Sequence, residues 1–172
     1  MSTAIENLVV FAHGKESGPW GTKITYLAET ARGRGFEVIS PDYSHTYDPR
    51  ARVTQLLTLA PRAKRLVLVG SSMGGYVSAQ ACAALKPQAL FLMAPALYFP
   101  GWEEEPVDVP ALCSVAHGWN DDIVPVERGI RFAETHRATL HVLNSDHGLN
   151  DQLPALALYF GNLLDQVKTG FA

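Results

Sequence analysis

The chain has 172 residues, of which 47% are hydrophobic and 18% charged, an ordinary balance for a globular domain with no long polar tract that would favour disorder. Its formal net charge is −3 and its lysines and arginines are scattered, so nucleic acid is not expected as the main partner. A chain of this length is expected to form one domain, residues 1–172, around a single sizeable core.

Predicted strands and helices alternate along the chain. Apolar or β-branched runs predict strands at residues 8–12, 37–40, 65–70, 89–93, 112–117 and 139–143. Segments with helical character lie between them, at residues 23–34, 50–59, 73–85, 126–136 and 151–167. This alternation predicts an α/β fold, a three-layer α/β/α sandwich with a mostly parallel sheet of about six strands.

The N-terminal segment and the two cysteines indicate where the protein is located and whether it holds a cofactor. The N-terminal segment lacks a basic stretch, and its apolar run is too short for a signal peptide or a membrane span. Cys82 and Cys113 lie in apolar surroundings without the spacing of a zinc site or a disulfide framework. We therefore expect a cytoplasmic protein with buried thiols, no membrane association, and neither a metal nor an organic cofactor.

One connection, residues 94–110, departs from the alternation of strands and helices. It contains four prolines, which preclude a long helix, and four large apolar side chains: Leu97, Tyr98, Phe99 and Trp102. Two interpretations stay open, an irregular loop that covers the edge of the core or a lid that faces substrate. The acidic run at 103–105 is typical of a solvated loop, and beside a pocket it would mildly repel anionic substrates. Because it lies on this connection, we expect it to disfavour anionic acyl or alcohol groups modestly, and neutral substrates to be preferred.

Residues 70–74, Gly-Ser-Ser-Met-Gly, form a G-x-S-x-G pattern directly after the best predicted strand and directly before a predicted helix. A serine on such a tight turn needs a backbone with positive φ, which crowds the residues two before and two after it. Gly70 and Gly74 satisfy that requirement only if Ser72 is the centre. The same glycines could merely make a tight turn. The pattern alone therefore does not predict a nucleophile, and a base that could activate Ser72 must also be found.

A histidine is the usual base for a serine nucleophile. Of the six histidines, His147 lies in the loop after the last predicted strand. In a parallel sheet this loop opens on the same carboxyl edge as the Ser72 turn. This position favours a role for His147 as the base over the alternative that it is an exposed loop residue without function. For the acid that orients the imidazole, the residues alone leave three candidates: Asp121, Asp122 and Asp146.

Two segments resemble motifs of the α/β-hydrolase superfamily. Residues 117–125, HGWNDDIVP, are similar to the HG-x-x-D-x-x-V-P turn of its esterases and thioesterases, and the resemblance implies that Asp121 is the triad acid. Residues 11–15, FAHGK, resemble the first-strand HG motif, whose following residue donates a backbone N–H to the oxyanion hole. By this resemblance the two donors are Lys15 and Met73. The order Ser72, Asp121, His147 also matches the family order.

The resemblance covers nearly the whole chain and is to small, lid-poor bacterial hydrolases of the carboxylesterase and thioesterase kind. It implies a minimal α/β-hydrolase fold that cleaves a small-molecule ester or thioester through an acyl-enzyme. The four apolar side chains of the 94–110 connection, Leu97, Tyr98, Phe99 and Trp102, are the expected substrate contacts, and they suit a short acyl chain. Lysine follows His13-Gly14 where many relatives carry an apolar residue, which leaves the substrate open.

Two alternatives to an esterase stay open on the sequence. The same triad could serve an amidase, a lactonase or a peptidase. A non-catalytic α/β-hydrolase fold that binds a ligand or a protein partner is the second alternative, because a fold does not by itself determine a function. The sequence does not indicate an oligomeric state.

Overall fold

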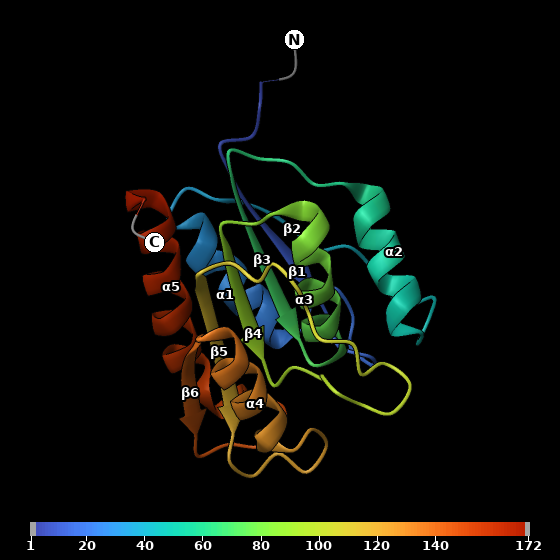
Figure 1. The fold of residues 1–172 in the computed structure, drawn as a ribbon. Coiled ribbons are helices and arrows are strands. Elements are labelled where there is room, and N and C mark those ends of the chain that lie inside the picture. Colours follow the sequence, from blue (N-terminus) through green and yellow to red (C-terminus); the bar gives the residue numbers. More distant parts are fainter. Residues whose placement is uncertain (1–2, 171–172) are drawn as a thin grey trace.

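A six-stranded sheet forms the centre of the molecule (Figure 1). The computed structural model describes residues 3–170. The strands are β1 (Asn7–Ala12), β2 (Glu37–Ile39), β3 (Arg65–Ser71), β4 (Ala89–Met93), β5 (Leu112–Gly118) and β6 (Thr139–Leu143). They lie in the order β2-β1-β3-β4-β5-β6, and each neighbouring pair is parallel. The predicted α/β class and its parallel sheet are confirmed.

Helices cover both faces of this sheet. They are α1 (Thr22–Arg32), α2 (Pro49–Leu59), α3 (Met73–Leu85), α4 (Val126–His136) and α5 (Leu153–Thr169). α1 and α5 pack together on one face, and α2, α3 and α4 lie on the other (Figure 1). The molecule is therefore the three-layer α/β/α sandwich that the sequence predicts.

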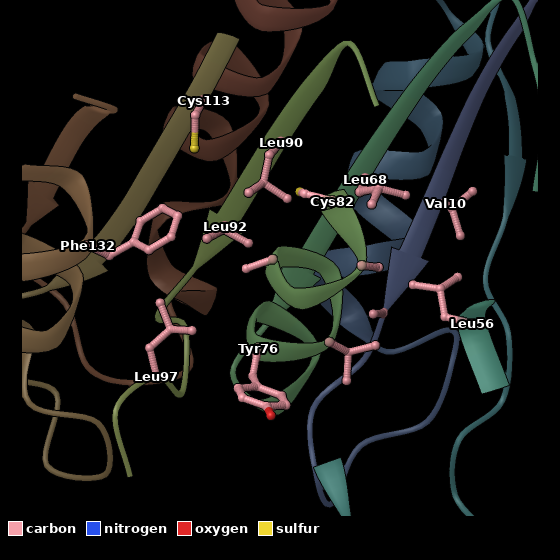
Figure 2. Close-up of a cluster of buried hydrophobic side chains, with 14 of the residues drawn as sticks. Val10, Leu56, Leu68, Tyr76, Cys82, Leu90, Leu92, Leu97, Cys113 and Phe132 are labelled. Carbon is pink, nitrogen blue, oxygen red and sulfur yellow. The ribbon is translucent and has the colours of Figure 1, made fainter. Parts of the chain in front are cut away.

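The side chains of β4 show how the sheet divides the core. Leu90 and Leu92 belong to the cluster that β4 shares with α3 and α4, drawn in Figure 2. Phe91 and Met93 pack in the second cluster, with α1 and α5. Because successive strand residues face opposite sides of a sheet, a strand covered on both faces must be apolar at every position.

The first and last helices differ slightly from the predicted ranges. The first ends at Arg32 rather than at residue 34, because the chain turns out of the helix and passes through Gly35 with φ of +78°. The last begins at Leu153 rather than at residue 151, after a short 3-10 turn over Asn150–Gln152. Pro154 lies in its first turn, where a missing N–H removes no helical hydrogen bond.

The order of the strands places a crevice at one edge of the sheet. β1 lies between β2 and β3, so the chain leaves β1 toward one side and later returns to its other side. In open parallel sheets, ligand sites form at the carboxyl ends of the strands, where the loops separate at such a switch point. The loops that follow β1, β3, β5 and β6 all open on this edge.

Part of the 94–110 connection belongs to the core. Leu97 and Tyr98 are buried, and Figure 2 shows Leu97 among the side chains packed between the sheet and α4. Arg128 of α4 donates to the carbonyl of Leu97 over 2.9 Å and also to that of Tyr98. Both residues were expected to contact substrate. They lie in the core instead, because these bonds and their burial hold them against α4.

Two residues of the acidic run at 103–105 contact helices. Glu104 pairs with Arg50 of α2 and accepts a hydrogen bond from the Tyr76 hydroxyl of α3 over 3.2 Å. The carboxylate of Glu105 lies 3.3 Å from Nε2 of His136, at the end of α4. These contacts keep Glu104 and Glu105 on the α2–α4 side of the sheet.

The structure also bears on the expected state of the two cysteines and on whether any helix could cross a membrane. Cys82 and Cys113 are both buried and free, as predicted, and burial raises the pKa of the Cys82 thiol to about 12. Among residues 3–170, none of the helices combines the length and the apolar character that crossing a bilayer requires.

Candidate active site

Ser72 stands on the turn between β3 and α3. Its backbone has φ of +55° and ψ of −119°, a conformation that side chains rarely adopt. A Cβ added to Gly74 would lie 1.9 Å from the Ala12 carbonyl oxygen, and one added to Gly70 would lie 2.2 Å from the Gly74 carbonyl oxygen. The spacing of the two glycines is therefore what lets this turn pack against β1.

Three predicted residues meet at the carboxyl edge of the sheet. Nε2 of His147, in the loop after β6, lies 3.0 Å from Oγ of Ser72. Nδ1 of the same imidazole lies 2.7 Å from Oδ2 of Asp121, in the loop after β5. The His147 side chain is 18% exposed, whereas that of Asp121 is fully buried. Such a chain of contacts can carry a proton from a hydroxyl to an imidazole held in one tautomer.

The surroundings of Asp121 distinguish it from the other candidate acids. Its Oδ1 accepts hydrogen bonds from the backbone N–H groups of Ile123 and Val124, over 2.9 and 2.8 Å. Asp122 is exposed, and Oδ1 of Asp146 accepts from the N–H of Gly148 over 2.9 Å. Of the three aspartates, only Asp121 is hydrogen-bonded to the His147 imidazole.

A second histidine contacts the same carboxylate, and the sequence did not predict this contact. Nε2 of the fully buried His117 lies 3.1 Å from Oδ2 of Asp121 and 2.9 Å from the Val124 carbonyl oxygen. In the sequence, His117 is the first residue of the HG-x-x-D-x-x-V-P motif, four residues before Asp121. The motif does not reveal that the turn after β5 folds back and brings the two side chains together. His117 thus supplies a further contact that holds the carboxylate in place.

The two residues expected to supply backbone donors lie in the same pocket as Ser72. Met73 is the first residue of α3, where a helix leaves its N–H groups without intrahelical acceptors. Within residues 3–170, the N–H of Lys15 donates no hydrogen bond. Gly14 packs against the serine, because a Cβ added there would lie 3.6 Å from that of Ser72. Both N–H groups are therefore free to bind an oxygen.

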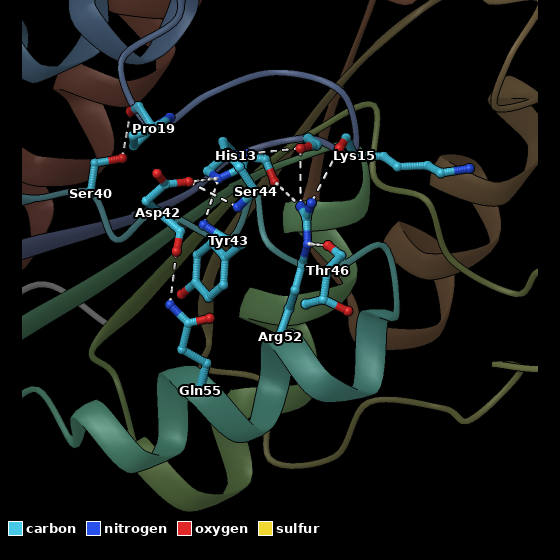
Figure 3. A network of polar contacts seen from close by, with 11 residues as sticks. His13, Lys15, Pro19, Ser40, Asp42, Tyr43, Ser44, Thr46, Arg52 and Gln55 are labelled. Atoms are coloured by element: carbon cyan, nitrogen blue, oxygen red, sulfur yellow. Dashed lines mark hydrogen bonds and ion pairs between the residues drawn. The ribbon is translucent and has the colours of Figure 1, made fainter.

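Arg52 of α2 holds the loop that carries Lys15 (Figure 3). The guanidinium is fully buried and donates to the carbonyls of His13, Gly14 and Lys15 over 3.3, 3.0 and 3.2 Å. A fourth bond of 2.9 Å goes to the carbonyl of Thr46. Nothing in the sequence indicates this arrangement, since an arginine in a helix with mixed polarity is normally an exposed residue.

The pocket around Ser72 has a volume of about 880 Å³. Of the four apolar side chains expected to contact substrate, Phe99 and Trp102 line this pocket, and their ring centroids lie 5.8 Å apart in a stacked arrangement. Leu97 and Tyr98 do not line it. The charged residues in its wall come from the segment that joins β1 to α1 and from the start of that helix; they are Lys15, Glu16 and Lys23. Among the described residues, no three His, Cys, Asp or Glu side chains are grouped so that they could hold a metal ion.

Comparisons with known proteins bear on this fold. The sequence matches the model of the Alpha/beta hydrolase family over residues 9–166. It is 32% identical to a protein of the alpha/beta hydrolase superfamily from Xanthomonas campestris pv. campestris, whose structure aligns with a TM-score of 0.84 over 94% of this chain and 99% of the other. No curated protein sequence matches the chain significantly.

Two further solved structures are similar. An α/β serine hydrolase without a lid, also from Xanthomonas campestris, is 25% identical and aligns with a TM-score of 0.66 over 95% of this chain and 83% of its own. Est1E from Butyrivibrio proteoclasticus is 17% identical and aligns with a TM-score of 0.84 over 97% of this chain and 90% of its own. The second likeness is one of fold alone.

Proposed function

The chain belongs to the alpha/beta hydrolase family, and from that premise we propose that it is a serine hydrolase that cleaves carboxylic esters or thioesters through an acyl-enzyme. The observation that carries the proposal is the contact of His147 with both Ser72 and Asp121, over 3.0 and 2.7 Å, at the floor of an open pocket. The likeness to a serine hydrolase without a lid adds support.

Acylation begins with attack of the Ser72 hydroxyl on the substrate carbonyl. Nε2 of His147 takes the hydroxyl proton, because Nδ1 keeps its own proton in the hydrogen bond to Asp121. The negative charge on the carbonyl oxygen is stabilised by the N–H groups of Lys15 and Met73, which need not reorganise for it. The imidazolium then protonates the leaving alcohol or thiol, and the acyl group stays on the serine oxygen.

Deacylation repeats these steps with water as the nucleophile. His147 accepts a proton from water as it attacks the acyl-Ser72 carbonyl, and returns that proton to the serine oxygen when the carboxylic acid leaves. The Phe99 and Trp102 rings offer apolar surface to a short acyl chain. The same groups could attack an amide, a lactone or a peptide, so the substrate preference depends on the rest of the pocket.

The Ser72→Ala variant tests this function. We expect it to fold normally and to lose ester hydrolysis by a factor on the order of 10⁴ to 10⁶, because Ser72 is the one hydroxyl of residues 3–170 that is hydrogen-bonded to His147. A fluorophosphonate should label the wild-type protein at Ser72, as located by mass spectrometry of the labelled peptide. Folded wild-type protein that is not labelled would instead favour a binding protein without catalysis.

A further inference from the structure

Lys23 of α1 is a charged residue in the pocket that the proposed reaction does not use. It lies in the first turn of the helix and is partly buried in the pocket wall. Burial lowers the pKa of its ammonium to about 8, although the carboxylates of Asp121 and Asp146 act in the opposite direction. The side chain therefore still carries its positive charge at neutral pH, in a place that is costly for a charge.

Both nearby aspartates have partners other than Lys23. Asp121 already accepts hydrogen bonds from two backbone N–H groups and from the His147 imidazole, and it contacts His117 as well. Oδ1 of Asp146 is bound by the N–H of Gly148. Within residues 3–170, no carboxylate lies within 4 Å of the Lys23 ammonium, and it donates no hydrogen bond. A partly desolvated ammonium in a pocket is thus left available for a ligand.

Other positive charges around the pocket would also attract an anionic ligand. The N-terminus of α1 has no side-chain cap at Gly21 and no acidic residue in its first turn, and its first residues line the pocket beside Lys23. The ammonium of Lys15 lies 5.3 Å from the Tyr47 ring centre at the pocket wall, and Figure 3 shows this side chain extending away from Arg52. Glu16, the single acidic residue that the described part of the chain contributes to the pocket wall, is exposed.

We propose that the pocket recognises esters that carry a second, carboxylate group, with Lys23 as the main contact and Lys15 as an additional one. The inference rests on the proposed function, since it names the class of substrate for the same site. The carboxylate would face the segment from Lys15 to the start of α1, while Phe99 and Trp102 hold the apolar part of the substrate. This differs from the preference for neutral substrates expected from the acidic run, because Glu104 and Glu105 contact α2, α3 and α4 and only Glu103 is left exposed without such a contact.

Two pairs of esters of matched size test the proposal. Monoethyl glutarate against ethyl pentanoate places the carboxylate on the acyl side, and butyryl glycolate against propyl butyrate places it on the alcohol side. We expect the wild-type protein to favour the anionic member of at least one pair in kcat/KM, by on the order of 10- to 100-fold, the factor that one charged hydrogen bond supplies. Lys23→Met should remove most of this preference, and Lys23→Arg should retain part of it.

The control variant is Lys64→Met. Lys64 precedes β3 at the opposite edge of the sheet, where it lies 3.4 Å from Glu6, so its loss should leave the ratio of the two rates unchanged. The absence of any preference for the anionic esters would overturn the proposal. So would a parallel loss on both members of a pair in Lys23→Met, because Lys23 would then act on the triad and not on the substrate.

A binding measurement separates this proposal from the proposed function. Monoethyl glutarate is titrated calorimetrically into the Ser72→Ala protein, which cannot form an acyl-enzyme, and into the Ser72→Ala, Lys23→Met double variant. We expect binding that weakens at least about tenfold without Lys23. Equal binding by both proteins would refute the carboxylate site even if esters are hydrolysed. Binding that depends on Lys23, without hydrolysis by the wild type, would refute the esterase and leave the site.

Discussion

The Asp121 carboxylate is a buried charge whose every contact is defined. One oxygen is held by the N–H groups of Ile123 and Val124, and the other faces the imidazoles of His147 and His117. A buried carboxylate is costly unless such partners replace water. Because the two backbone donors come from the same turn as the aspartate itself, the carboxylate cannot rotate without losing both bonds. Its second oxygen therefore stays directed at His147.

Replacing Asp121 by asparagine should lower kcat for ester hydrolysis by a factor on the order of 10⁴. The backbone N–H groups of Ile123 and Val124 will keep the amide oxygen on their side, so the amide NH₂ will face His147. Nδ1 must then accept a hydrogen bond, and the proton moves to Nε2, which can no longer take one from Ser72. Steady-state kinetics with a neutral ester measure the effect.

Two neighbouring aspartates serve as controls for that change. Asp122 is exposed, and Asp146 bonds to the backbone of its own loop, so Asp122→Asn and Asp146→Asn should retain most of the activity. A large loss in Asp146→Asn with little loss in Asp121→Asn would show that His147 takes its partner from its own loop, contrary to the structure.

Single residues differ in how far the sequence reveals their position. Ser72 and His147 could be predicted because each lies in a loop that follows a strand, Ser72 within a G-x-S-x-G pattern, and parallel strands bring such loops to one edge. His117 could not, because its contact with Asp121 arises from a turn that folds back on its own strand. Arg52 left no signal either, since all of its hydrogen-bond acceptors are backbone carbonyls, which every sequence possesses.

At the level of elements, the loop after β1 depends on helix α2. This loop lies outside any strand, and its three carbonyls from His13 to Lys15 accept from the Arg52 guanidinium (Figure 3). The His13 side chain also anchors this loop, because its Nε2 accepts a hydrogen bond from the N–H of Tyr43 over 2.9 Å. With the carbonyls turned toward α2, the N–H of Lys15 is left free beside Ser72.

The variant Arg52→Met should therefore impair catalysis from a distance. The unpaired carbonyls will let the loop move, and loss of one oxyanion donor lowers kcat by on the order of 100- to 1,000-fold, whereas KM should change little. Stability should fall as well, because each buried acceptor left without a donor costs about 1 to 3 kcal/mol. Kinetics at low temperature, normalised to the active sites titrated with a fluorophosphonate, separate the two effects.

Arg50→Met, on the same helix, is the matched control. Arg50 is exposed and pairs with Glu104, away from the loop after β1, so its kcat should stay close to that of the wild type. If Arg52→Met loses stability but keeps its kcat, the arginine supports the fold without setting the position of Lys15.

Elements were predictable where burial imposes a period on the sequence. β4 and α3 have the predicted bounds, because an apolar strand covered on both faces and a helix that begins at the Ser72 turn each leave a clear pattern. The connection at 94–110 has no such period. Nothing in its order of residues distinguishes Leu97 and Tyr98, which enter the core, from Phe99 and Trp102, which reach the pocket.

In the whole molecule, apolar and charged surfaces are separated around one pocket. Phe99 and Trp102 come from the connection after β4, whereas Lys15 comes from the segment between β1 and α1 and Lys23 from the first turn of α1. The 94–110 connection is the only long insertion at this edge of the described chain, and it is partly tied to α4 through Arg128. Beyond Phe99 and Trp102 the lining adds only single apolar side chains from separate segments, among them Tyr47, Ile123 and Val124. The continuous apolar surface offered to an acyl chain is therefore short.

This limited apolar surface predicts a preference for short acyl chains, of roughly two to six carbons. Each buried CH₂ contributes about 0.8 kcal/mol, so kcat/KM should rise by up to about fourfold per methylene from acetyl onward. Once the chain passes Phe99 and Trp102, added carbons stay in water and contribute nothing, so the rate should level off. Matched oxygen esters and thioesters from acetyl to palmitoyl measure this profile. A rate that climbs through the long chains would mean that the 94–110 connection opens into an acyl tunnel, which would require Leu97 and Tyr98 to leave the core.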